Sequence, residues 1–239
     1  MSARRRHAAF VALAFLAFPA PACRSGSAPQ PAGDSAGRAP YGGPRLVLLG
    51  TGTPRADPAR MGPCVALLAG GEAYLFDAGV GLVRRAAEAA AGHPELESKR
   101  LSRVFLTHLH SDHTLGYPDL IFTPWVLGRE KPLEAYGPAG LRSMTDHVLA
   151  AWAEDIGVRT KGAEGNPAEG VRVDVHEIQP GYEFRDARVT ITSFAVEHGT
   201  WPGAYGYRIE AGDRTMVISG DTTATEAVVR ACDGCDVLV

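Results

Sequence analysis

The 239-residue sequence has only four cysteines, no internal repeat and no apolar run of the roughly 20 residues that a membrane-spanning helix needs. Cys232 and Cys235 form a single CxxC pair, and without a second pair they cannot complete a four-cysteine zinc site. In an exported protein they could form a disulfide, but we favour Cys235 as a small buried residue opening the last strand. The composition, 45% hydrophobic and 21% charged, argues against a fibrous or wholly disordered chain.

The N-terminus has the three parts of a secretory signal. A cluster of arginines at residues 4–6 precedes the apolar run 8–18, and Ala20-Pro21-Ala22 follows as a small-x-small cleavage site. Cys23 comes next, so the site also resembles a bacterial lipoprotein signal in which this cysteine is acylated. Ala20 stands where such signals usually have leucine. We therefore predict a signal peptide over residues 1–22.

Residues 23–44 are rich in glycine, serine, alanine and proline and are predicted to be a flexible tether. The protein is then exported from a bacterium, either as a periplasmic or outer-membrane lipoprotein or as a secreted protein. A lipid anchor at Cys23 would be its only contact with a membrane. Residues 45–239 are predicted to form the hydrolase domain described below.

The sequence also lacks an excess of basic charge. Removal of residues 1–22 takes three arginines and no acidic residue, which leaves 21 basic against 27 acidic residues and a formal net charge of −6. Because nucleic-acid binding depends largely on neutralising phosphates, nucleic acid is not expected as a partner.

Short apolar runs alternate with helical patterns after the tether. Strands are predicted at 45–49, 64–68, 73–76, 103–107, 133–136, 171–178, 189–196, 205–210, 215–218 and 236–239. Helices are predicted at 80–91, 118–126 with Pro124 kinking or ending it, 141–155 and 225–231. This mixture favours the α/β (α+β) class, with two sheets packed face to face and helices outside.

Four metal-ligating residue types fall within six positions directly after the apolar strand 103–107. His108 and His110 are two residues apart, so on an extended segment their side chains point the same way and can bind one ion. Asp112 and His113 follow where the chain turns, and they can face a second ion. Two ions about 3.5–4 Å apart would hold a bridging hydroxide as nucleophile.

Two further residues follow predicted strands. His198 comes after the strand 189–196, and Asp221 follows the strand 215–218. Alone, His198 would be read as a polar turn residue and Asp221 as a helix N-cap. The histidine cluster changes this interpretation, because residues at the ends of several strands meet at one edge of a sheet. We therefore expect both to join the metal site.

The HxHxDH motif of residues 108–113, with the segments 48–53 and 76–79, resembles the metallo-β-lactamase superfamily. Segments 196–199, 205–208 and 219–222 are similar to its branch containing ribonuclease Z and the zinc arylsulfatases. The resemblance covers residues 45–239. It is specific for the fold and much less specific for the substrate.

The resemblance implies a four-layer αβ/βα sandwich with two zinc ions at one sheet edge. It implies that the first zinc is held by His108, His110 and His198, and the second by Asp112 and His113, with Asp221 bridging both. Asp112 and Asp221 are thus the expected catalytic residues. Asp77 would orient the ligands through hydrogen bonds, and Thr107 and the loop 50–54 would be structural.

Two departures from the family pattern stand out. The family usually supplies a His-Glu pair after a strand such as 236–239 and then a final histidine for the second zinc. The His-Glu pair and the final histidine are both missing from this sequence, so we expect it to be a C-terminally truncated fragment. Ribonuclease Z also has a long arm that holds tRNA, whereas the segment 147–177 is too short and too poor in basic residues to be clearly that arm.

The leading hypothesis is an exported zinc-dependent hydrolase of a small anionic ester, either a sulfate ester or a phosphodiester. Arg60, Trp201 and Tyr205 could line its pocket, although the two aromatic residues could equally serve packing. The alternatives are a ribonuclease Z-like endonuclease, a β-lactamase and a non-catalytic metal-binding protein. A small-molecule ester is the expected partner, and a homodimer is compatible with the sequence.

Overall fold

The computed structural model describes residues 43–239 of the chain. The predicted signal peptide, the predicted lipidation site Cys23 and nearly all of the predicted tether lie outside the described residues. Within residues 43–239, every helix is too short or too polar to span a bilayer.

The first sheet has six strands in the order β1-β2-β3-β4-β5-β6. They are β1 (Arg45–Gly50), β2 (Cys64–Ala69), β3 (Glu72–Phe76), β4 (Arg103–Phe105), β5 (Leu133–Gly137) and β6 (Val173–Glu177). The first three strands pair antiparallel, and β3 to β6 pair in parallel. Gly70 and Gly71 join β2 to β3 with positive φ angles of 54° and 81°, as a two-residue hairpin turn requires.

The second sheet has five strands in the order β11-β10-β9-β8-β7. They are β7 (Glu183–Arg185), β8 (Val189–Ala195), β9 (Tyr205–Ala211), β10 (Arg214–Ile218) and β11 (Val237–Leu238). Strands β7 to β10 pair antiparallel, whereas β11 pairs with β10 in parallel. The sequence prediction missed β7, because three residues with charged side chains at both ends carry no apolar run.

Helices connect the parallel strands and cover the sheets. They are α1 (Leu82–Ala89), α2 (Ser111–Thr114), α3 (Tyr117–Val126), α4 (Leu141–Ala151), α5 (Ala153–Lys161), α6 (Ala168–Val171) and α7 (Glu226–Ala231), with 3₁₀ turns η1 (Pro94–Leu96) and η2 (Ser98–Arg100). The predicted helix 141–155 is divided at Trp152, and Pro124 lies inside α3 without ending it. The first residues of α7 follow Thr225, whose hydroxyl caps the helix by accepting from the Val228 amide.

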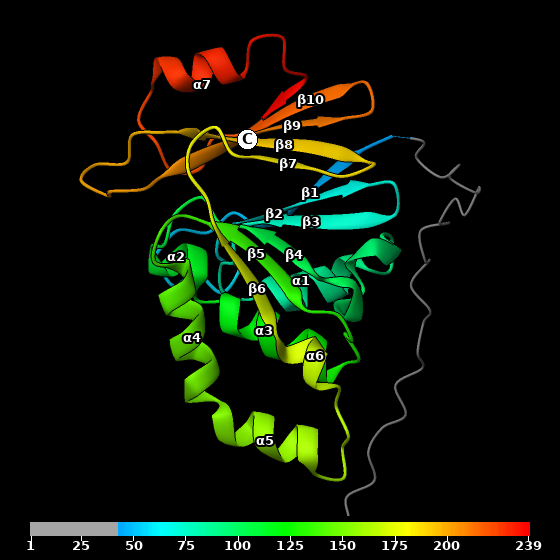
Figure 1. Cartoon of the computed structure of the whole chain (residues 1–239). Coiled ribbons are helices and arrows are strands. Elements are labelled where there is room, and N and C mark those ends of the chain that lie inside the picture. Colours follow the sequence, from blue (N-terminus) through cyan, green and yellow to red (C-terminus); the bar gives the residue numbers. More distant parts are fainter. Residues whose placement is uncertain (1–42) are drawn as a thin grey trace, which may run out of the picture. The chain divides into compact units, whose positions relative to one another are not determined.

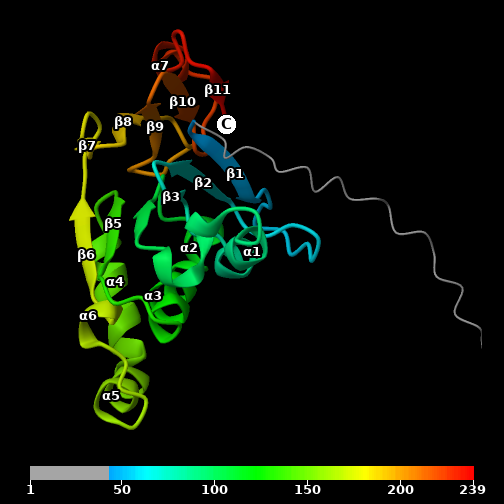
Figure 2. The same ribbon diagram turned by 90° about the vertical axis from the view of Figure 1, so that its right-hand side faces the viewer.

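Two cores hold the layers together, and β2 contributes to both. Its residues Cys64, Ala66 and Leu68 pack toward the helices α1 and α3, whereas Val65 and Leu67 pack against the second sheet. Because both faces of β2 are buried, its sequence is a continuous apolar run. Figures 1 and 2 show the sheets stacked, with α1, α3 and α4 outside the first sheet and α7 outside the second. The predicted mixed α/β class with two facing sheets is confirmed.

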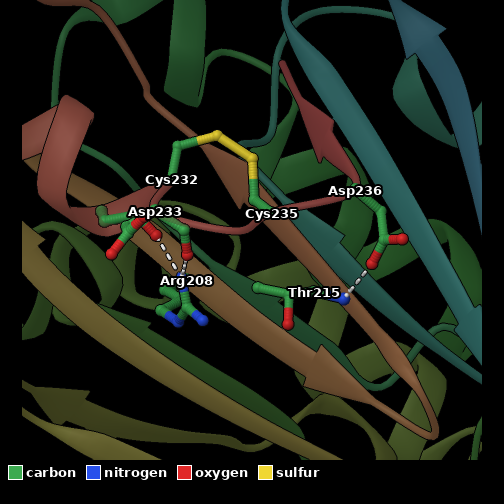
Figure 3. Close-up of a disulfide and its surroundings, with 7 residues drawn as sticks. Arg208, Thr215, Cys232, Asp233, Cys235 and Asp236 are labelled. Carbon is green, nitrogen blue, oxygen red and sulfur yellow. Dashed lines mark hydrogen bonds between the residues drawn. A yellow bond between two sulfur atoms is a disulfide. The ribbon is translucent and has the colours of Figure 1, made fainter.

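The CxxC pair forms a disulfide, contrary to the prediction that Cys235 opens the last strand. The chain turns between α7 and β11, where the Cys235 amide donates to the carbonyl of Cys232 at 3.0 Å, and the two Cα atoms are 4.8 Å apart. Figure 3 shows Arg208 beside this turn, donating to the backbone carbonyl of Asp233. The turn brings the two sulfurs together, so Cys235 belongs to the turn, and the last strand, β11, begins two residues later at Val237.

A buried arginine joins three segments beneath the first sheet. The guanidinium of Arg129 is almost fully buried and donates to the backbone carbonyls of Leu101, Leu120, Ile121 and Gly170 at 2.7–3.1 Å. Burial lowers the pKa of Arg129 to about 10, so the side chain still carries its charge at neutral pH. This role was not predicted from the sequence, since Arg129 lies in a polar stretch after α3.

We predict that Arg129→Met strongly destabilises the fold, because four buried carbonyls lose their donor. The free energy of unfolding, measured by denaturant titration, should fall by about 3–5 kcal/mol. Arg185→Met is the matched control, since Arg185 is exposed and, among the described residues, pairs only with Glu183. Equal stability of the two variants would contradict the role given to Arg129.

Candidate metal centre

The predicted ligands come from loops that leave both sheets at the same edge. His108 follows β4 and Asp77 follows β3 in the first sheet, whereas His198 follows β8 and Asp221 follows β10 in the second. Helix α2, which begins just after His110, lies at this edge (Figure 1). The ends of four strands thus bring together side chains that are up to 144 positions apart in the sequence.

Three histidines form the first group. The Nε2 atom of His108 lies 2.9 Å from Nδ1 of His110, and the Nε2 atom of His198 lies 3.0 Å from that same Nδ1. The three nitrogens therefore point at one common region. Tetrahedral ligands of a zinc ion stand about 3.3 Å apart, given Zn–N bonds of about 2.0–2.1 Å. The separations are close to those of ligands around one ion.

Hydrogen bonds fix which nitrogen of His108 faces this region. The Thr107 hydroxyl donates to the Asp77 carboxylate at 3.0 Å, so its oxygen is free to accept from Nδ1 of His108, also at 3.0 Å. Nε2 of His108 is then unprotonated and presents its lone pair. Burial, together with the nearby charge of His113, lowers the pKa of His108 to about 3, so the ring stays neutral.

The second group is built around His113, which is buried in α2. Its Nδ1 contacts the Asp77 carboxylate at 2.8 Å. Its Nε2 is buried without a hydrogen-bond partner among the described residues and lies 3.4 Å from an Asp221 oxygen and 3.7 Å from an Asp112 oxygen. Asp77 thus orients His113 directly and His108 through Thr107, the kind of support that metal-binding histidines require.

Asp77 is held in a conformation that non-glycine residues seldom adopt. Its φ is 61°, and among the described residues no other non-glycine residue has a positive φ. The Thr107 amide donates to its carboxylate at 2.8 Å, and its own amide donates to the Phe105 carbonyl at 2.9 Å. These bonds compensate for the backbone strain, and they place the carboxylate between the two histidines.

The charges around His113 favour a cation. Burial alone would lower its pKa, but its contacts with Asp221 and Asp77 outweigh this effect and raise the pKa of His113 to about 10. The contact with His113 in turn lowers the pKa of the Asp221 carboxyl. A positive charge at this nitrogen is therefore stabilised, whether a proton or a metal ion supplies it.

The donor set fits a metal. His108, His110 and His198 form one group of ligand atoms within 4.8 Å of one another, and His108, His113 and Asp221 form another. Imidazole and carboxylate are ligands that suit zinc. The unpartnered, buried Nε2 of His113 is the atom whose position a bound ion would explain.

Asp112 and the three residues predicted to line a pocket differ in how close they lie to the two groups of metal ligands. Asp112 approaches only His113 among the predicted ligands, through the 3.7 Å contact given above. Trp201 lies beside the first group, with its ring centre 4.1 Å from that of His110. Tyr205 is buried and its hydroxyl donates to the Ile178 carbonyl, so it serves packing instead of lining a pocket. Arg60 is exposed on the loop beside Asp112.

Sequence reasoning missed the apolar surroundings of the site. Val80 and Leu115 are exposed and lie in a pocket next to Asp112. A single valine or leucine between polar residues resembles any other surface residue in the sequence. No signal was available, because the two positions become neighbours only through tertiary contacts, such as the Gly116 amide donating to the Ala78 carbonyl at 2.8 Å.

Comparison with known proteins gives three consistent similarities. A model of the beta-lactamase superfamily domain matches residues 72–239. Ribonuclease Z from Mycobacterium bovis (strain BCG / Pasteur 1173P2) is 34% identical over 197 residues, covering 81% of this chain and 68% of the relative. Ribonuclease Z from Mycobacterium sp. (strain KMS) is 36% identical over 196 residues, covering 81% and 67%.

Solved structures agree with these matches. The crystal structure of human tRNase Z, short form, is similar with a TM-score of 0.64 and 25% sequence identity. The similarity covers 81% of this chain and 76% of the human chain.

These similarities overturn the expected partners. The prediction that a small-molecule ester is the substrate and that nucleic acid is no partner is wrong, because the relatives are ribonucleases and a tRNase. The prediction used the net charge of the whole chain. An acidic average does not determine the local electrostatic potential at one site on the surface of a protein.

Proposed function

Because this chain belongs to the metallo-β-lactamase superfamily, on the branch that contains ribonuclease Z, we propose that it is a zinc-dependent endonuclease that hydrolyses phosphodiester bonds in RNA. The superfamily and the class, a metal-dependent hydrolase of ester bonds, were predicted from the motifs and are confirmed. The observation that carries the proposal is the convergence of histidine and aspartate side chains at one sheet edge in a chain that is 34% identical to ribonuclease Z.

We assign two zinc ions to this edge. His108, His110 and His198 would hold the first ion, which the 2.9–3.0 Å separations of their nitrogens support. Asp112 and His113 would hold the second, with Asp221 between the two. The contacts of Asp221 Oδ1 with His113 at 3.4 Å and of Asp221 Oδ2 with His198 at 3.9 Å support this intermediate position.

The chain's own residues supply orientation and charge for the reaction. Bound zinc would polarise the phosphate and make a water molecule more acidic. Asp77 and Thr107 hold the imidazole rings of His113 and His108 so that their lone pairs face the site. The Asp221 side chain is 47% exposed, the most accessible of the acidic groups there, so its carboxylate can meet the substrate. Asp112 and Asp221 are the proposed catalytic residues.

The proposal is tested by incubating zinc-loaded protein with an end-labelled oligoribonucleotide and with a folded transfer RNA transcript. We expect internal cleavage of at least one RNA, which stops when zinc is removed with a chelator and returns when zinc is restored. Zinc-loaded protein that leaves both RNAs intact would refute the proposed function.

We also propose that the protein is exported. The arginine cluster, the apolar run and the small-x-small site before Cys23 support this proposal. Mass spectrometry of the protein from its native host should find processing directly before Cys23, and an acyl mass on this residue if the signal is of the lipoprotein type. A mature protein that retains Met1 and the arginines at residues 4–6 would contradict export.

A further inference from the structure

A pocket of about 480 Å³ lies directly beside Asp112. The loop that follows β1 forms one wall, with Pro54, Pro58 and Met61 among its residues, and Val80 and Leu115 form the other. Ser111 and Asp112 also line the pocket and connect it to the metal site. The volume falls within the roughly 300–1,000 Å³ of small-molecule sites, and most of the named wall residues are apolar.

Val80 and Leu115 are apolar side chains that do not pack into either hydrophobic core. They are 54% and 63% exposed, although both flank a concave surface next to the metal site. Exposed apolar side chains that gather around a pocket indicate a surface used for binding. A flat apolar group inserted here would remove both from water.

The wall formed by the loop is held in place by backbone contacts. The Gly52 amide donates to the Met61 carbonyl at 2.7 Å and closes the loop, and the Gly62 amide donates to the Val80 carbonyl at 3.1 Å. At Gly62 a Cβ atom would come within 3.0 Å of the Asp112 carbonyl oxygen and closer still to the Val80 amide nitrogen, so only glycine permits this approach. The pocket is therefore preformed beside the site.

Positive charge accompanies the apolar surface. Arg55 and Arg60 both line the pocket, and neither forms an ion pair with another described residue. Asp57 also lines the pocket, and its carboxylate accepts from the Ala59 amide. A ligand that combines a flat apolar ring with a neighbouring phosphate matches this combination of surfaces.

We propose that this pocket binds the nucleobase of the nucleotide next to the phosphate that is hydrolysed, an inference that rests on the proposed function. A phosphate held at the metal site would lie beside Asp112, and Asp112 is one of the residues that line the pocket. The base attached to that phosphate through its ribose then reaches Val80 and Leu115. Base contacts of this kind are tolerant of sequence, because every base has an apolar face.

The test compares the binding of adenosine 5′-monophosphate with that of ribose 5-phosphate, which lacks the base, by isothermal titration calorimetry. The wild-type protein should bind the nucleotide about tenfold more tightly, as expected for burying one base against apolar side chains. Leu115→Ser should remove most of this preference and leave the affinity for ribose 5-phosphate unchanged.

Leu127→Ser is the matched control. Leu127 is 58% exposed and follows the last residue of α3, as Leu115 follows the last residue of α2, but it lies outside the pocket. This variant should keep the tenfold preference. Equal or undetectable binding of both ligands by the wild-type protein overturns the proposal, and so does a Leu115→Ser protein that keeps the preference.

The RNA cleavage assay separates this inference from the proposed function. Wild-type protein that cleaves RNA but binds the two ligands equally would overturn the base pocket alone. Protein that leaves RNA intact yet prefers the nucleotide, with a loss in Leu115→Ser only, would overturn the RNA substrate and support the pocket as a nucleotide site.

Discussion

Replacing both His108 and His110 by alanine is expected to remove most of the bound metal from the protein. Their facing nitrogens are 2.9 Å apart, and His108 belongs to both groups of ligand atoms. The wild-type protein, purified without chelator, should contain close to two zinc ions per chain by inductively coupled plasma mass spectrometry. Because each lost imidazole removes a ligand from the first ion, the double variant should retain only a small fraction.

A matched double variant controls for the loss of two imidazoles. His147 and His176 are exposed on α4 and β6, away from the cluster. Their replacement by alanine should leave the zinc content unchanged, and circular dichroism should show that both double variants are folded. Equal zinc content in the two double variants would mean that the metal binds elsewhere, and wild-type protein without metal would refute the assignment.

The second large effect is expected from Asp221→Asn. This change keeps the shape of the side chain but removes the negative charge that lies beside both His113 and His198. We expect kcat for RNA cleavage to fall by at least about a hundredfold, the effect of losing a principal electrostatic element of an active site. The fold should survive, because the side chain is half-exposed at the sheet edge and not part of a core.

Asp213→Asn is the control for this substitution. Asp213 is highly exposed in the turn between β9 and β10, at the opposite end of β10 from Asp221. Its replacement should leave kcat unchanged. A folded Asp221→Asn protein with the turnover of the wild type would place the activity elsewhere, and a chain that binds zinc but cleaves no RNA would favour a non-catalytic role.

Much of the fold follows from local patterns. The continuous apolar run of β2 and the Gly70-Gly71 turn were sufficient to predict the first hairpin. The histidine cluster at residues 108–113, together with the strand ends before His198 and Asp221, led to the prediction that these distant side chains meet. In contrast, the break at Trp152 between α4 and α5 has no proline or glycine to mark it, and the predicted helix ran through it.

The parts that the sequence could not show depend on tertiary contacts. Arg129 is identifiable as a buried donor only when the carbonyls of four separate residues are in place around it. The disulfide between Cys232 and Cys235 depends on the direction of the turn between α7 and β11. The substrate was misjudged for a related reason, since net charge is a property of the whole chain and binding depends on a small part of its surface.

The most direct test of the metal centre is an anomalous difference map from crystals of the zinc-loaded protein, measured at the zinc absorption edge. The account predicts one peak at about 2.0–2.1 Å from nitrogens of His108, His110 and His198. It predicts a second peak within about 4 Å of the first, in contact with His113, Asp112 and Asp221. A map with no peak at this sheet edge, or with zinc bound only at other residues, would contradict it.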